Sequence, residues 1–143
     1  MVEAIVSLGS NLGDRLSYLN RALEMLQSMP KTRLIKSSSV IETQPIDVPA
    51  DFEDLKFLNQ VAIFATELSA EEFSRRMHLI EDKLGRVRTV KNGPRTIDID
   101  LIDFGGIKMN TPELVLPHPR AHERDFVIKP LKELQRALSG DNN

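Results

Sequence analysis

Two amphipathic segments separate runs of apolar and β-branched residues, and this order limits the folds that the chain can adopt. Leucines recur at helical spacing over residues 15–28, and a second helical pattern runs from Ser69 to about Leu84. Asp14 is expected to cap the first helix, and Ser69 with Glu72 is a capping-box signature for the second. Strands are expected at residues 2–8, 32–43, 56–67 and in the aspartate-rich segment after Arg95. The order predicts an α+β fold, a ferredoxin-like βαββαβ sandwich whose helices lie on one face of an antiparallel sheet.

The remaining segments complete one domain over residues 1–143. Two prolines and four acids predict a long loop at residues 44–54, and Gly105 and Gly106 predict a turn. A terminal helix over residues 126–138, entered through Pro130, is expected after an irregular stretch. A chain of 143 residues with 41% hydrophobic residues can bury one substantial core.

Composition narrows the possible partners and cofactors. Because cysteine is absent, any metal must be held by oxygen or imidazole ligands. The net charge of −2 gives no reason to expect nucleic acid or an acidic membrane as a partner. The first residues do not have the pattern of a signal peptide, and no apolar run approaches the ~18–20 residues that span a bilayer. We therefore expect a cytoplasmic protein.

The segment GPRTIDIDLIDFG at residues 93–105 carries three aspartates where a buried strand would avoid charge. Side chains of a strand alternate between faces, so Asp98 and Asp100 share one face, ~6.6–6.8 Å apart along the strand. This spacing suits two carboxylates that flank a pair of Mg²⁺ ions ~3.5–4 Å apart. A solvated sheet face decorated with acids is the alternative. Asp103 has the opposite parity and is expected on the side of the isoleucines and leucines, where it either reaches solvent or caps the following turn.

A cationic segment precedes this strand. Between Leu84 and Ile97 the chain has no acid, and its four basic residues are Arg86, Arg88, Lys91 and Arg95. Guanidinium groups bind phosphate oxygens bidentately, so these residues and the aspartates could hold a polyphosphate between them. A solvated charged loop is the alternative. The sequence contains no Walker A motif.

Other polar features are less specific. In SLGSNLGD, residues 7–14, the glycines are expected to permit a close approach of the backbone at a strand-to-helix turn. His118 lies between two prolines, with Arg120 and Arg124 nearby, and could contact a second phosphate or a ribose. His78 and His122 are interpreted as surface or packing residues.

Five segments in order carry a resemblance to a known family. They are SLGSNLGDR at 7–15, FLNQV at 57–61, GRVR at 85–88, GPRTIDIDLIDFG at 93–105 and LPHPRAHERDFV at 116–127. Together they resemble 6-hydroxymethyl-7,8-dihydropterin pyrophosphokinases of folate biosynthesis, from Ile5 to about Leu134. The resemblance implies an enzyme that transfers pyrophosphate from ATP to the hydroxymethyl oxygen of the pterin and releases AMP. It also implies a monomer.

The resemblance implies roles for individual residues. Asp98 and Asp100 would bind two Mg²⁺ ions that bridge the triphosphate, and Arg86 and Arg95 would clamp the transferred group. The residues implied to bind the pterin are Thr43, Pro45, Ile46, Phe57, Asn59 and Phe126, of which the two phenylalanines would sandwich the ring. The residues implied to bind ATP are Glu81, Arg88, Leu101, Leu114, His118 and Arg124. The segments 44–54 and 85–95 would close over the substrates.

The chain departs from the family pattern just before Gly93. Asn92 stands where relatives usually carry a bulky aromatic residue, and the loop at 89–92 is short, so closure over the pterin is expected to differ. No general base can be named. Two other functions are considered: a ferredoxin-like RNA-binding domain, disfavoured by the net charge of −2 and a single tyrosine, and a regulatory domain that binds nucleotide without turnover.

Overall fold

The structure, a computed structural model, describes residues 1–43, 56–85, 96–121 and 125–138; in the last range the described side chains are those of residues 127–134. The strands are β1 (Val2–Ser10), β2 (Thr32–Ser37), β3 (Ile41–Thr43), β4 (Phe57–Thr66), β5 (Asp98–Phe104), β6 (Met109–Asn110) and β7 (Val115–Leu116). The helices are α1 (Arg15–Gln27), α2 (Ala70–Lys83) and α3 (Asp125–Leu138).

The main sheet is antiparallel and places β1 at its centre. The strand order is β2-β4-β1-β5. Strand β3 also pairs with β4, the strand that pairs with β2. β4 is buried at its last eight positions, because both faces of the sheet are covered there. β6 and β7 form a separate two-stranded sheet. The predicted α+β architecture, an antiparallel sheet with helices packed on it, is confirmed.

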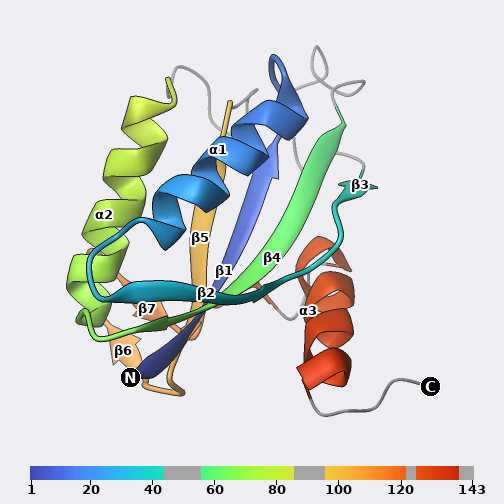
Figure 1. The fold of residues 1–143 in the computed structure, drawn as a ribbon. Helices are drawn as coiled ribbons and strands as arrows, with labels where there is room; N and C mark the ends of the chain where they lie inside the picture. Colours follow the sequence, from blue (N-terminus) through green and yellow to red (C-terminus); the bar gives the residue numbers. More distant parts are fainter. Residues whose placement is uncertain (44–55, 86–95, 122–124, 139–143) are drawn as a thin grey trace.

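The helices cover both faces of the sheet rather than one. The main core joins α1 and α2 to one face through residues such as Leu19, Phe73 and Phe64. A second cluster on the other face joins Leu134 of α3 to Val61 and Ile63 of β4. Figure 1 shows α3 beside β3 and β4, away from α1 and α2. The expectation of helices on one face is therefore wrong for α3, whose apolar stripe covers the residues of β4 that alternate with the main core.

Both predicted helix caps are formed. The Asp14 carboxylate accepts a hydrogen bond from the Ser17 amide at 3.2 Å, and the Ser69 hydroxyl accepts one from the Glu72 amide at 3.1 Å. The Glu72 carboxylate accepts hydrogen bonds from Arg75 and Arg76 rather than from the backbone amide of Ser69, the cap residue. Hydrogen bonding from Arg75 lowers the pKa of Glu72, on an exposed surface of α2.

A β-bulge changes the face on which Asp103 lies. Val6 of β1 pairs with Leu101, but Ile5 pairs with Asp103, so one extra residue of β5 lies between the two pairs. Paired residues share a face, and Asp103 therefore lies on the face of Asp98 and Asp100. The predicted opposite parity is wrong for this reason. The predicted turn cap is confirmed, because the Gly106 amide donates to the Asp103 carboxylate at 3.2 Å.

Two boundaries differ from the sequence-based expectation. The strand predicted over 32–43 is divided into β2 and β3 by residues 38–40. The terminal helix begins at Asp125, so Pro130 lies inside it rather than at its start. In the part of the chain that the structure describes, no helix is long and apolar enough to cross a membrane.

Candidate active site

Three residues on adjacent strands form one row across the sheet. Gly9 of β1 pairs with Asn59 of β4 on one side and with Asp98 of β5 on the other. Paired residues point to the same face, and two strand spacings separate Asn59 from Asp98 by roughly 9–10 Å. Since Gly9 has no side chain, nothing of the central strand projects between them. The row lies on the face that α3 covers lower down, near Val61.

At the β4 end of the row, three of the residues predicted to bind the pterin lie close together. Asn59 is 3% exposed, and its Nδ2 donates to the Thr43 hydroxyl at 2.5 Å. Thr43 pairs with Phe57 across the β3–β4 ladder. A Cβ atom at Gly9 would lie 3.0 Å from Asn59 Oδ1 and 3.4 Å from Phe57 Cδ1. Gly9 therefore permits a close approach of the Asn59 and Phe57 side chains, but it lies within β1 rather than in the predicted strand-to-helix turn.

The β5 end of the row carries the two aspartates. Asp98 pairs with Gly9 and Asp100 with Ser7, so the predicted shared face is confirmed. Both side chains are partly exposed, while Ile99 between them is buried. In the described ranges no three potential ligands among His, Cys, Asp and Glu cluster closely enough to hold a metal ion. The two carboxylates fit Mg²⁺, which is commonly held by one or two carboxylates together with substrate phosphates and water.

The structure does not bring every predicted ATP residue onto this face. The side chain of Leu101 is 4% exposed in the core beneath α1 and α2. Glu81 is 1% exposed, and its carboxylate accepts a hydrogen bond from the Ile99 amide at 2.8 Å. Leu114 packs against the main core. The roles of these side chains toward ATP stay predictions.

His118 is held at the outer edge of β5. Its amide donates to the Ile102 carbonyl at 2.8 Å, and its Nδ1 accepts from the Arg120 amide at 3.2 Å. The sheet order leaves that edge of β5 away from β1, so the segment of His118 lies beside the strand that carries the aspartates. Its predicted contact with ATP stays a prediction.

Several predicted residues fall outside the described parts of the chain. The segments 44–54 and 85–95 lie outside the described residues, with the exception of Gly85. Asn92, where the chain departs from the family pattern, lies outside them too. The individual residues concerned are Pro45, Ile46, Arg86, Arg88, Arg95 and Arg124, together with the side chain of Phe126.

One residue near the site was assigned no role from the sequence, although it ends the segment SLGSNLGDR that carries the family resemblance. Arg15, at the start of α1, forms an ion pair with Glu42 at 3.0 Å and donates to the Lys56 carbonyl at 2.9 Å. These partners directly precede Thr43 and Phe57 in the chain. Arg15 thus joins the two strand ends that carry predicted pterin residues, and because its partners are distant in sequence, no local pattern could have revealed these contacts.

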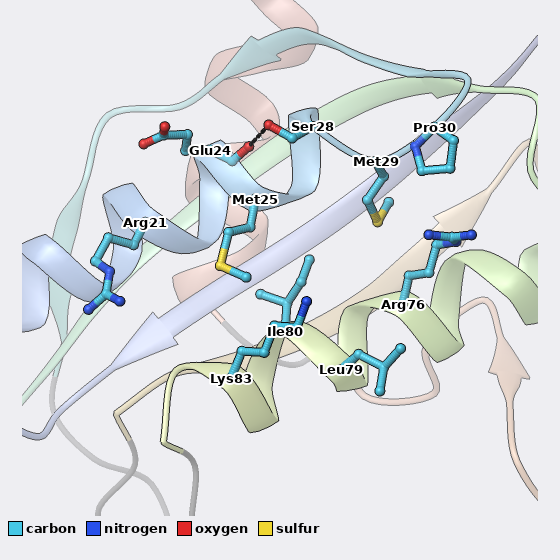
Figure 2. A pocket seen from close by; sticks show the side chains of 10 residues that line it. All are labelled: Arg21, Glu24, Met25, Ser28, Met29, Pro30, Arg76, Leu79, Ile80 and Lys83. Atoms are coloured by element: carbon cyan, nitrogen blue, oxygen red, sulfur yellow. Dashed lines mark hydrogen bonds between the residues drawn. The ribbon is translucent and has the colours of Figure 1, made fainter.

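A groove of about 530 Å³ lies on the opposite side of the molecule, between α1 and α2. Figure 2 shows Arg21, Arg76 and Lys83 around an apolar floor that includes Met25 and Ile80. Because α1 and α2 cover the face away from Asp98 and Asp100, this groove is separate from the candidate site.

Comparisons with known proteins identify relatives over nearly the whole chain. Residues 5–136 match the model of a family described as 7,8-dihydro-6-hydroxymethylpterin-pyrophosphokinase. The chain is 40% identical over 132 residues to a Bacillus subtilis protein named 2-amino-4-hydroxy-6-hydroxymethyldihydropteridine pyrophosphokinase, covering 92% of this chain and 77% of that protein. A protein of the same name from Haemophilus influenzae is 36% identical, with 96% and 84% covered.

Other relatives are much longer than this chain. A Pneumocystis carinii protein named folic acid synthesis protein fol1 is 39% identical over 143 residues, and 97% of this chain matches only 18% of it. Among solved structures, an HPPK-DHPS in complex with substrates superposes with a TM-score of 0.68 at 14% identity, covering 93% of this chain and 40% of that one. A Plasmodium falciparum HPPK-DHPS with pteroate gives a TM-score of 0.69 at 14% identity, with 92% and 38% covered. The chain spans about two fifths of those structures, which establish the shared fold.

Proposed function

The chain belongs to the 7,8-dihydro-6-hydroxymethylpterin-pyrophosphokinase family, and from this we infer that it is an enzyme of folate biosynthesis. It transfers the β,γ-diphosphate of ATP to the hydroxymethyl group of 6-hydroxymethyl-7,8-dihydropterin and releases AMP. It is a 2-amino-4-hydroxy-6-hydroxymethyldihydropteridine pyrophosphokinase, the activity for which its relatives from Bacillus subtilis and Haemophilus influenzae are named.

We assign this activity to one face of the sheet because Asn59, Gly9 and Asp98 lie there in one row. Asn59 is fixed by Thr43 and offers its amide to the pterin, while Asp98 and Asp100 lie one strand beyond Gly9. The separation of roughly 9–10 Å leaves room for a hydroxymethyl group and a phosphate between the two ends. Phe57 and Phe126 are assigned to the two sides of the pterin ring, where aromatic stacking is favourable.

Asp98 and Asp100 are proposed to hold two Mg²⁺ ions. Their oxygen donors and shared face support this proposal. When bound, the ions would supply positive charge that offsets the charge of the triphosphate. Arg86 and Arg95 are proposed to clamp the transferred group, and the proposed ATP contacts are Arg88, Leu101, Leu114, His118 and Arg124.

The chain accelerates the transfer mainly by positioning and charge neutralisation. The hydroxymethyl oxygen of the pterin forms a bond to the β-phosphorus of ATP. It approaches in line with the bond between that phosphorus and the oxygen that leaves with AMP. That second bond breaks, and the electron pair leaves with AMP. The hydroxyl proton is released in the same reaction, and no residue of the chain is assigned as its acceptor.

Two broader assignments accompany this function. The strand order β2-β4-β1-β5, with all pairs antiparallel and a helix after β1 and after β4, supports a ferredoxin-like βαββαβ topology to which β3, β6, β7 and α3 are additions. The family resemblance supports a monomer that works in the cytoplasm on small-molecule substrates.

The reaction is tested by incubating the protein with ATP, Mg²⁺ and 6-hydroxymethyl-7,8-dihydropterin and measuring AMP. Pterin-dependent AMP release is the expected result. ADP as the product would indicate an ordinary kinase instead. Binding of ATP without turnover would indicate the alternative function, a regulatory domain that binds nucleotide. The presence of both aspartates argues against this alternative.

A further inference from the structure

A buried carboxylate reaches the aspartate strand from behind the site. Glu81 of α2 is 1% exposed, and its Oε2 accepts a hydrogen bond from the backbone amide of Ile99 at 2.8 Å. Its Oε1 lies 2.9 Å from Nδ1 of His78, one turn earlier on the helix. Ile99 is the residue between Asp98 and Asp100, so this bond fixes the peptide that joins the two proposed metal ligands.

The position of β5 in the sheet explains why its backbone uses a side chain here. β5 is the terminal strand of the sheet order and pairs with β1 along one edge. Along its other edge, backbone groups require other partners, and a buried amide without one is destabilising. At Ile99 the Glu81 carboxylate takes the place of a neighbouring strand, through a charge-assisted bond that is stronger than one between neutral groups.

The burial of the Glu81 carboxylate indicates that its hydrogen bonds, rather than its charge alone, explain why a glutamate is present here. A charged group removed from water is costly unless hydrogen bonds compensate it. Glu81 meets this cost with the Ile99 amide and with His78, whose own side chain is 52% exposed. A leucine would fill the same volume on the buried stripe of α2, so the acceptor rather than the packing distinguishes glutamate at this position.

We propose that Glu81 is a positioning residue that sets the orientation of the Asp98–Asp100 segment for metal binding, rather than a ligand of ATP. The proposal rests on the proposed function, in which both aspartates hold Mg²⁺. The side chain of Glu81 lies on the α2 side of β5, whereas the aspartates point to the opposite face. Its effect on the metals therefore passes through the Ile99 backbone.

The test compares Glu81→Ala, which removes the acceptor, with Glu81→Gln, whose amide oxygen can still accept from Ile99. Glu71→Ala, an exposed substitution in the first turn of the same helix, is the matched control. Binding of Mn²⁺ in the presence of a non-hydrolysable ATP analogue is measured by electron paramagnetic resonance. Exchange of the Ile99 amide is measured by NMR in metal-free protein. We expect Glu81→Ala to weaken Mn²⁺ binding by ~10-fold or more, the range for residues that orient metal ligands.

The same change should accelerate exchange at Ile99 more than at Val6 and Leu8 of β1, and Glu81→Gln should retain most of both properties. Equal loss of Mn²⁺ affinity in the Gln and Ala variants, with Ile99 still protected, would overturn the proposal and indicate that the charge itself acts on the ligands. If Glu81→Ala does not fold, the Gln variant decides between these outcomes. Absence of AMP release by the unaltered protein would refute the function, whereas the exchange of Ile99 tests the positioning bond independently.

Discussion

The amide of Asn59 donates a hydrogen bond to the hydroxyl of Thr43 at 2.5 Å, across two paired strands. This bond sets the orientation of the amide group, so that Oδ1 lies toward Gly9. Thr43→Val keeps the shape of the side chain but leaves the Asn59 donor unpaired. We expect kcat/KM for the pterin to fall roughly tenfold, because an unsatisfied buried group costs about 1–3 kcal/mol. Thr43→Ser, which keeps the hydroxyl, should retain activity; equal losses in the two variants would contradict this role.

The two aspartates on one face of β5 should be indispensable for turnover. Asp98→Ala and Asp100→Ala are each expected to reduce AMP release by on the order of 10²-fold or more, because the charge of the triphosphate would no longer be offset. Circular dichroism should show an intact fold. Asp103→Asn is the matched control: it lies on the same face, but its carboxylate accepts from Gly106, so we expect a loss of about 0.5–1 kcal/mol in stability and normal turnover. Near-full activity of either Ala variant would refute the metal assignment.

A methyl group at Gly9 should disturb the pterin end of the site. Its Cβ would lie 3.0 Å from Asn59 Oδ1, closer than ordinary contacts, so the amide must move. We expect Gly9→Ala to raise the KM for pterin by on the order of tenfold, with little change for ATP. Gly106→Ala is the control, because it meets no atom within 4 Å but strains a backbone at φ +75°, which should cost about 1–2 kcal/mol of stability without changing KM. An unchanged pterin KM in Gly9→Ala would show that the close approach has no role in binding.

Arg15 should act on pterin binding through the strand ends that it joins. Arg15→Ala removes the ion pair with Glu42 and the bond to the Lys56 carbonyl. Because the ion pair is partly exposed, we expect the pterin KM to rise by only roughly two- to fivefold, which matches a loss of about 0.4–1 kcal/mol. Arg33→Ala, on the exposed side of β2, is the comparison and should leave KM unchanged. A loss confined to ATP binding in Arg15→Ala would argue against this link.

Phe126 is proposed to stack on the pterin from the first turn of α3. Phe126→Ala should weaken pterin binding roughly tenfold, since stacking adds to the apolar area that is buried. Isothermal titration with pterin and with an ATP analogue separates the two effects. Equal losses for both ligands would count against stacking and favour a general disturbance of α3.

Local sequence patterns identified much of the fold and part of the site. Helix caps depend on neighbours a few residues away, and Asp14 and Ser69 were both predicted correctly. The shared face of Asp98 and Asp100 follows from the alternation of a strand. The predicted family membership is confirmed by the family match over residues 5–136. The segments 44–54 and 85–95, which include Arg86 and Arg95, stay predictions.

The tertiary structure decided the features that depend on a distant partner. Asp103 changed face because β5 has one more residue than β1 between two pairs, and only the paired strand reveals such a bulge. α3 packs on the second face of the sheet because alternate residues of β4, on the face opposite α1 and α2, are buried by α3. The family resemblance implied a contact of Glu81 with ATP, yet burial against β5 gives its carboxylate the Ile99 amide as a partner. Alternation and capping are properties of a few consecutive residues, whereas register, layer and burial arise only when separate segments pack together.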